Sequence, residues 1–319
     1  MRRWIVAMLA AVMAPLPAVA HDRVALTFDD LPSLSLLQSQ PYTDYSNLMI
    51  LRGLKHHHMP AIGFVNEGKL DEGMRSRQID NLKAWVRAGM ALGNHTFSHE
   101  SPNTISAQAY IDDIARGERV TRPLLAEHHK TLTWFRYPYL ETGSTVQEKD
   151  AIQGWLKGHG YRVAPVTMEN SDWMFAEPYD DAISRRQDER VKRIRAEYLA
   201  YTEDMITWYQ QAGHALLGRP MAFVMLLHVT RLNADCIDDL AVILKRHHIK
   251  PVSLDAAMKD PAYRIDDPYV GPNGIEWLER WSITLHKDLP WDSFKEPPAD
   301  IEAEYKTVDN DLQGSGHSQ

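Results

Sequence analysis

The amino-acid sequence predicts a parallel α/β protein, and three observations support this fold class. Short apolar runs of strand length alternate with longer segments of helical periodicity from Val24 to about residue 260. About seven such repeats fit either a (β/α) barrel or a doubly wound sheet. The composition is that of a folded protein, with 44% hydrophobic and 24% charged residues among 319.

The first twenty residues have the order of a secretory signal. Two arginines precede an apolar run from Trp4 to Met13, and the segment ends in the small-residue triplet 18–20. The apolar run is too short to cross a bilayer, which requires about 20 apolar residues. We therefore expect residues 1–20 to be removed, leaving an exported chain without a transmembrane span, in the periplasm or outside the cell.

Seven runs have the length and apolar composition of strands. They are residues 24–28, 61–65, 91–94, 132–135, 161–164, 222–227 and 250–253. Between them, apolar residues recur at helical spacing, as at Ile79, Leu82 and Val86. Ser106 precedes another such segment and is a predicted N-cap. The main domain is thus predicted to span residues 21–260.

The second half of the chain contains two further segments. Residues 180–211 are highly charged with helical spacing, which predicts an exposed helix or helix pair with interleaved opposite charges. From Pro261 onward the alternation of strands and helices fades, so we expect a C-terminal extension over residues 261–319. After about Asp300 the apolar content is low, which predicts a disordered tail.

Composition and charge exclude several function classes. A single cysteine excludes a disulfide framework and any metal site built from several cysteines. A metal site must therefore use carboxylates and the 15 histidines. The net charge of -8 argues against a nucleic-acid partner, because binding phosphates needs a basic face. The oligomeric state is not predicted by any sequence feature.

Polar residues follow several predicted strands, where a parallel fold collects its site. Asp29 and Asp30 follow the first strand. At least one of these adjacent carboxylates would be partly buried, which costs free energy and argues against a purely structural role for both. His95 and His99 follow the third strand and converge on one metal if the segment turns helically, with Asp30 completing the set. Later strand ends carry Arg136, Tyr139, Glu169, Asp172, Trp173 and His228. This arrangement outlines a hydrolytic metal site.

These motifs resemble those of the polysaccharide deacetylases, the NodB-homology group that forms carbohydrate esterase family four. In family order they are 27–30, 95–99, 136–139, 169–173 and 224–228. The resemblance covers roughly residues 23–260. It implies a distorted (β/α) barrel of about seven parallel strands, here with a C-terminal extension.

The resemblance also implies a metal and a base. The metal is a divalent ion, usually zinc, with cobalt or nickel as alternatives, and its ligands would be Asp30, His95 and His99. Asp29 would be the general base, and Arg136 would fix its orientation.

The acid and the acyl-binding groups are implied in the same way. His228 would be the general acid, and Asp172 would hold its charge and tilt. The backbone near Tyr139 would polarise the acyl oxygen, and Trp173 would line the acetyl pocket beside Leu226.

The sequence departs from the family pattern at several positions. Leu31 follows the aspartate pair where glycine is common, and Tyr137 and Leu140 stand where proline and glycine are usual. Glu169 replaces an aspartate, and Val229 stands where aspartate is common. Because every proposed catalytic residue is kept, we expect activity, with an unusual cleft for the sugar.

The leading hypothesis is an exported hydrolase that removes N-acetyl groups from peptidoglycan, chitin or poly-N-acetylglucosamine, using a metal-activated water. The alternatives are an O-acetyl esterase of xylan type and a non-catalytic carbohydrate-binding member. A two-His one-carboxylate iron oxygenase is disfavoured by the strand–helix alternation and by the second aspartate beside the ligand.

Overall fold

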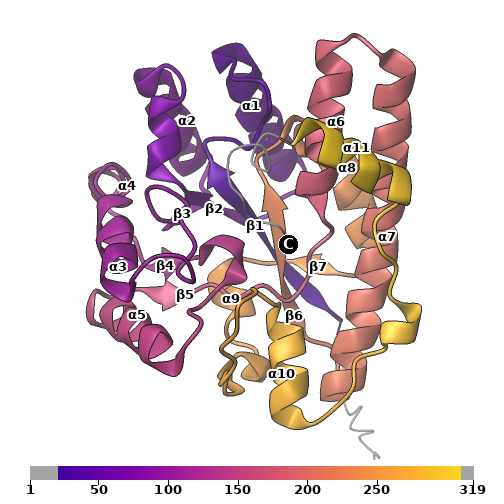
Figure 1. Ribbon diagram of the computed structural model, residues 1–319. Helices are drawn as coiled ribbons and strands as arrows, with labels where there is room; N and C mark the ends of the chain where they lie inside the picture. Colours follow the sequence, from indigo (N-terminus) through magenta and orange to yellow (C-terminus); the bar gives the residue numbers. More distant parts are fainter. Residues whose placement is uncertain (1–20, 310–319) are drawn as a thin grey trace, which may run out of the picture.

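The structure is a computed structural model that describes residues 21–309, and its centre is one curled parallel sheet (Figure 1). Its strands are β1 Arg23–Leu31, β2 Ala61–Val65, β3 Ala91–Asn94, β4 Trp134–Phe135, β5 Arg162–Val163, β6 Ala222–His228 and β7 Lys250–Pro251. The order is β5-β4-β3-β2-β1-β6, and β7 pairs with the start of β1. Each predicted run overlaps a strand, and the parallel α/β class is confirmed.

The sheet curls because the segment after β5 returns to β6. The amide of Thr167 donates to the carbonyl of Val224 at 3.0 Å, and the amide of Leu226 donates to the carbonyl of Met168 at 2.9 Å. On its other side β6 pairs with β1 along its length, so that His228 lies opposite Asp29. The expected distorted (β/α) barrel is therefore confirmed.

Helices surround the sheet (Figure 1). The α-helices are α1 Gln40–His56, α2 Arg75–Arg87, α3 Ala107–Arg116, α4 Thr121–Glu127, α5 Val146–Gly158, α6 Asp172–Ser184, α7 Asp188–Leu217, α8 Arg231–Arg246, α9 Leu254–Ala257, α10 Trp277–Leu285 and α11 Ala299–Val308. Short 3₁₀ turns are η1 Glu67–Asp71, η2 Pro138–Leu140, η3 Pro261–Arg264 and η4 Trp291–Ser293. Ser106 caps α3 as predicted, since its hydroxyl accepts from the amide of Ala109 at 3.2 Å.

The central strand β1 sets which side chains face the inside of the barrel. Every residue from Val24 to Leu31 is buried, as expected for a strand covered on both faces. Val24, Leu26 and Phe28 belong to the large core beneath the helices, whereas Ala25 belongs to a smaller second cluster. Successive side chains alternate between faces, so Thr27 and Asp29 follow Ala25 toward the inside.

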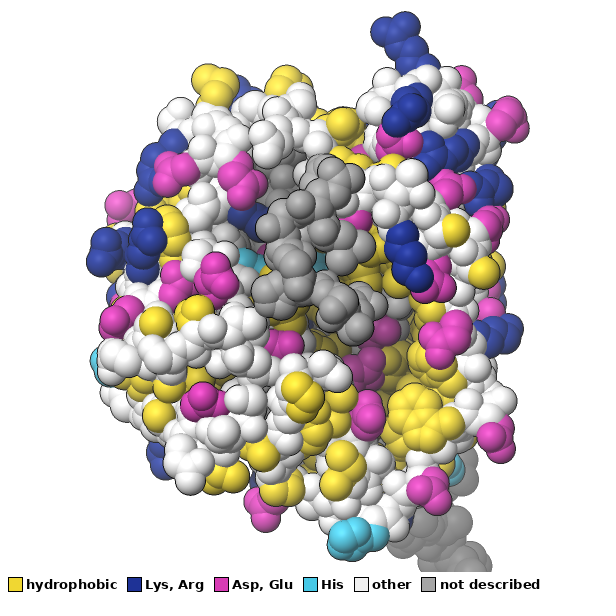
Figure 2. Space-filling view, viewed as in Figure 1, with side chains coloured by type: hydrophobic (Ala, Val, Ile, Leu, Met, Phe, Trp, Pro, Cys, Tyr) yellow, Lys and Arg dark blue, Asp and Glu magenta, His cyan; other side chains and the backbone are white. Residues whose placement is uncertain are grey.

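The predicted charged segment forms most of α7 and the end of α6. On this side of the molecule, at the upper right of Figure 2, Lys and Arg side chains are interspersed with Asp and Glu. Arg185 pairs with Asp181 at 2.7 Å, and Arg193 pairs with Glu197 at 3.0 Å. The expectation of a helix pair with interleaved charges thus agrees with the structure.

Residues 299–308 of the C-terminal extension form a helix, where the sequence predicted a disordered tail from about Asp300. Helix α11 crosses α6 (Figure 1), and its Ile301 is fully buried. Arg190 and Arg193 of α7 form ion pairs with Glu304, and Arg193 also pairs with Asp300 at 2.7 Å. The expectation of disorder is therefore wrong for residues 300–308, because low apolar content does not reveal a helix held by charges and one buried side chain.

Two of the sequence predictions concern the ends of the chain, which lie outside the described residues. These are the secretory signal at 1–20 and the disordered tail beyond Asp309. Within residues 21–309, no helix combines the length and the apolar character needed to cross a membrane.

We expect Ile301→Ala to lower the free energy of unfolding by about 2–5 kcal/mol, because it removes buried methyl groups where α11 packs. Urea unfolding followed by circular dichroism measures the change. The control Ala303→Ser, at an exposed position of the same helix, should change stability by less than about 0.5 kcal/mol. If both variants match the parent, α11 does not pack as described.

Candidate active site

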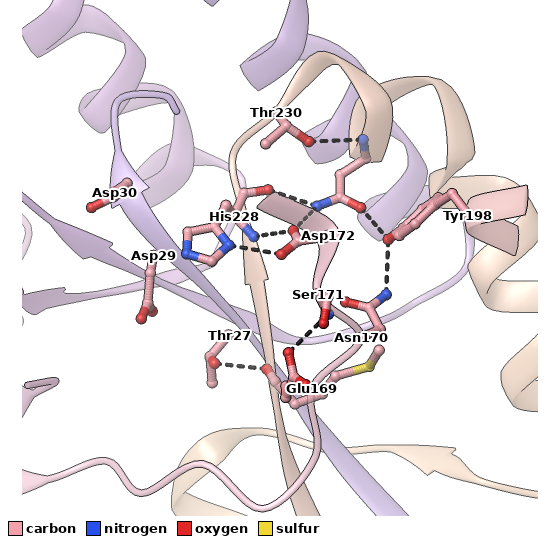
Figure 3. Close-up of polar contacts among 12 residues, drawn as sticks. Thr27, Asp29, Asp30, Glu169, Asn170, Ser171, Asp172, Tyr198, His228 and Thr230 are labelled. Atoms are coloured by element: carbon pink, nitrogen blue, oxygen red, sulfur yellow. Dashed lines mark hydrogen bonds and ion pairs between the residues drawn. The ribbon is translucent and has the colours of Figure 1, made fainter. Parts of the chain in front are cut away.

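The side chains named from the sequence meet at the carboxyl edge of the sheet. Asp29 and Asp30 lie near the end of β1, and His228 is the last residue of β6 (Figure 3). His95 directly follows β3, and Arg136 directly follows β4. Because neighbouring parallel strands end at one edge, residues more than 100 positions apart in the chain share one site.

Asp30, His95 and His99 form the cluster suited to a metal. One possible ligand atom from each lies within 4.8 Å of the others. Oδ1 of Asp30 is 3.7 Å from Nε2 of His95 and 3.4 Å from Nε2 of His99. This oxygen is buried and has no hydrogen-bond partner among the described residues. A buried carboxylate oxygen facing two imidazole nitrogens is costly unless a cation joins them.

The protonation of this cluster also fits a metal. Burial lowers the pKa of His95 and of His99 to about 4, although Asp30 opposes the effect, so both rings are neutral near pH 7. Burial would raise the pKa of Asp30, but attraction to Lys69, His99 and His95 outweighs it and keeps the pKa well below its usual range. Neutral imidazoles and an ionised carboxylate are the ligand forms of these side chains.

The loop between the two histidines is not helical, and both rings nevertheless converge on Asp30. Thr96 and His99 have positive φ values of 66° and 58°. The loop is held by the side chain of Asn94, whose Oδ1 accepts from the amide of Thr96 at 2.7 Å. Gly117 is needed beside it, because a Cβ there would lie 2.4 Å from the backbone carbon of Thr96.

Asp29 is paired with a fully buried arginine. Nη1 of Arg136 lies 3.2 Å from Oδ2 of Asp29, and its Nη2 donates to the hydroxyl of Thr27 at 2.9 Å. Nε donates to the carbonyl of Ala164 at 2.8 Å. Burial raises the pKa of Asp29 to about 6, with Arg136 and His228 limiting the rise. Asp29 is therefore a carboxylate of increased basicity that is still ionised at neutral pH.

His228 is held by Asp172 at the start of α6 (Figure 3). Its Nδ1 lies 2.8 Å from Oδ1 of Asp172, and its backbone amide donates to Oδ2 at 2.7 Å. Burial lowers the pKa of His228, but attraction to Asp172 outweighs this effect and raises it to about 9. The imidazole is therefore cationic at neutral pH, with Nε2 available to another partner.

Two residues behind this pair were not identified from the sequence. The amide of Asn233 donates to Oδ2 of Asp172 at 2.5 Å and to the carbonyl of His228 at 2.8 Å. Tyr198 donates to Oδ1 of Asn233 at 2.6 Å (Figure 3). The only sequence indication is the N-cap Thr230, which places Asn233 in the first turn of α8 directly after His228.

A third residue missed from the sequence is Lys69 of η1. Its Nζ lies 3.7 Å from Oδ2 of Asp30, so the two carboxylate oxygens have different neighbours, a lysine on one and two histidines on the other. No motif in the sequence indicated this lysine.

The residues named for the acyl group lie around the same edge. Tyr139 has a positive φ of 55°, its side chain is 58% exposed, and its ring centroid is 4.6 Å from that of His99. Trp173 is partly buried, with its ring 5.0 Å from that of Tyr305 in α11. Leu226 is partly buried on β6, opposite Thr27. Their roles toward an acetyl group remain predictions.

Comparison with known proteins shows that part of this chain is similar to one protein family. Residues 18–163 match the model of the polysaccharide deacetylase family. A chitin deacetylase from Colletotrichum lindemuthianum is 27% identical over 150 residues, which are 47% of this chain and 52% of the relative. The chain therefore spans about half the length of that relative.

Solved structures support the fold. A polysaccharide deacetylase from Bacillus cereus matches with a TM-score of 0.51 and 17% identity, covering 73% of this chain and 92% of that one. A pseudoenzyme of carbohydrate esterase family four from Bacillus anthracis has a TM-score of 0.51 and 18% identity, covering 75% and 66%. The resemblance of this chain to the polysaccharide deacetylases of the NodB-homology group, carbohydrate esterase family four, is thereby confirmed.

Proposed function

We propose that this protein is a metal-dependent hydrolase that removes N-acetyl groups from an amino-sugar polysaccharide. The observation that carries the proposal is the meeting of three potential ligands, a basic carboxylate and a cationic imidazole at one edge of the barrel. The family supports an acetylated polysaccharide as the substrate, and peptidoglycan, chitin and poly-N-acetylglucosamine are the candidate polymers. Residues 1–20 would direct export to the periplasm or the exterior.

Asp30, His95 and His99 would hold the metal, which we propose to be zinc, with cobalt or nickel as alternatives. A bound ion would act as a Lewis acid and lower the pKa of water. His95 is oriented for this role by its Nδ1, which lies 2.9 Å from the carbonyl of Arg136 and leaves Nε2 facing Asp30.

Asp29 would accept the proton of the attacking water. Its pKa of about 6 makes it a better base than a solvated aspartate, while most of it is still ionised at pH 7. Arg136 keeps the carboxylate in one orientation, since it is fixed in turn by Thr27 and Ala164.

His228 would donate a proton to the leaving nitrogen. An amine leaves poorly unless it is protonated, and a cationic imidazole supplies that proton. Asp172 occupies Nδ1 and so directs Nε2 to the substrate. The backbone near Tyr139 would polarise the acyl oxygen, and Trp173 and Leu226 would line the acetyl pocket.

The activity is tested by acetate release from N-acetylglucosamine oligomers, peptidoglycan and acetylated xylan, using zinc-loaded and chelator-treated protein. We expect the loaded protein to release acetate from N-acetylated glycans and Asp29→Asn to lower kcat by about 10²–10⁴-fold, because the base is lost. Release from acetylated xylan alone would instead identify an O-acetyl esterase, and release from none would contradict the proposal.

The pH dependence of kcat/KM should be bell-shaped. Activity should rise as Asp29 loses its proton near pH 6 and fall as His228 loses its proton near pH 9. In Asp172→Asn the attraction that raises the pKa of His228 is gone, so the alkaline limb should move to lower pH. The exposed Asp112→Asn is the control. An alkaline limb that does not move in Asp172→Asn would rule out His228 as the acid.

The ligand assignment is tested by calorimetric titration of metal-free protein with zinc. We expect His99→Ala to weaken zinc binding by at least about 100-fold, since even neighbours of metal ligands contribute 10- to 100-fold. His128→Ala, at an exposed histidine outside the cluster, should bind zinc like the parent. Equal affinity of the parent and His99→Ala would show that the metal lies elsewhere.

A further inference from the structure

The turn that follows Arg136 has a backbone conformation that its residues disfavour. Tyr139 and Leu140, both in η2, have positive φ values of 55° and 56°, and neither is glycine. The left-handed region is unfavourable for residues that carry a side chain, because the Cβ comes close to the following carbonyl oxygen. Such a conformation persists only where the surrounding structure holds it, so this turn depends on contacts from outside.

Arg280 of α10 makes such contacts from the C-terminal extension. Its Nη2 donates to the carbonyl of Leu140 at 2.7 Å, and its Nη1 donates to the hydroxyl of Thr142 at 3.1 Å. Its Nε donates to the carbonyl of Ile275 at 2.9 Å, which fixes the guanidinium to the extension itself. Because the side chain of Arg280 is fully buried, water does not compete for these bonds.

The charge of Arg280 is balanced by Asp267. Nη1 of Arg280 lies 3.0 Å from Oδ2 of Asp267, and Nζ of Lys149 in α5 lies 3.1 Å from the same oxygen. Lys149 also donates to the backbone carbonyls of Asp267 and Tyr269, at 2.6 and 2.8 Å. The extension is thus anchored to α5, and the guanidinium is held in one position by charged partners.

Gly274 brings the extension against the same turn. A Cβ at this position would overlap with the carbonyl oxygen of Tyr139, so only glycine allows the two backbones to approach this closely. The ring centroid of Tyr139 lies in turn 4.6 Å from that of His99, a proposed metal ligand. Contacts from the extension therefore reach the metal cluster through one residue of the turn.

We propose that Arg280 is a positioning residue for the reaction, because it holds Tyr139 and Leu140 in the left-handed conformation that directs the backbone near Tyr139 to the acyl oxygen. This rests on the proposed function and deepens it, since it makes the C-terminal extension part of the active site. It also accounts for Leu140 at a position where the family usually has glycine. The bonds of Arg280 to the turn replace the conformational freedom that glycine would supply.

Acetate release by zinc-loaded protein tests this role. Arg280→Lys keeps the charge that faces Asp267, but an ammonium cannot reproduce the planar set of bonds that the guanidinium makes. We expect kcat to fall by about tenfold or more while KM changes by less than about twofold, because a misplaced donor acts on the transition state and not on glycan binding. Arg264→Lys, at an exposed position in η3 of the same extension, should keep both constants.

A glycine in the turn distinguishes positioning from a purely structural role. Glycine adopts left-handed φ values readily, so adding Leu140→Gly to Arg280→Lys should raise kcat again by at least about fivefold. Adding Leu140→Ala removes the side chain beyond Cβ without supplying this freedom, and it should recover nothing. An unchanged kcat in Arg280→Lys, or a recovery no greater with glycine than with alanine, overturns the proposal.

Hydrogen exchange of the turn provides a measurement that does not need turnover. The amides of Leu140 and Glu141 donate to backbone carbonyls within the turn, at 3.2 and 3.1 Å. These amides should exchange about tenfold faster or more in Arg280→Lys, but not in Arg264→Lys. Unchanged exchange in Arg280→Lys also overturns the proposal. If exchange rises there but the parent releases acetate from no glycan, Arg280 holds the turn and the proposed function fails.

Discussion

The rest of the site depends on the ion pair and the hydrogen bonds of the buried Arg136 guanidinium. It contacts Asp29 and Thr27 on β1 and the carbonyl of Ala164 after β5, while its own carbonyl accepts from the ring of His95. One side chain and its backbone thus connect the proposed base to a potential metal ligand. Removing one partner of such a buried ion pair typically lowers the free energy of unfolding by about 3–5 kcal/mol. The orientation of the proposed base and the stability of the barrel core therefore depend on the same contact.

The site keeps Asp29 ionised and His228 protonated at the same pH. Asp29 and His228 lie opposite each other on paired strands, yet each has its own buried counter-ion. Arg136 limits the rise of the Asp29 pKa, and Asp172 raises the pKa of His228. Between about pH 6 and 9 the carboxylate is therefore charged and the imidazole is protonated, the combination that a hydrolase with a base and an acid needs.

Much of this arrangement could be predicted from the sequence, because strand periodicity and the position of polar residues after strands are local properties. What could not be predicted depends on tertiary contacts. The loop from His95 to His99 turns through left-handed residues that are not glycine, supported by the close approach of Gly117. Asn233 and Lys69 act on Asp172 and Asp30 from distant elements, and α11 is held by arginines of α7.

We propose that the strand ends build one metal centre from Asp30, His95 and His99. Anomalous diffraction at the zinc absorption edge, from crystals of the protein grown with zinc, tests it most directly. We expect one strong peak, from an ion that lies about 2.0–2.2 Å from Oδ1 of Asp30 and from Nε2 of both histidines, the distances usual for zinc with oxygen and nitrogen ligands. A peak at other histidines, or none at this cluster, would contradict it.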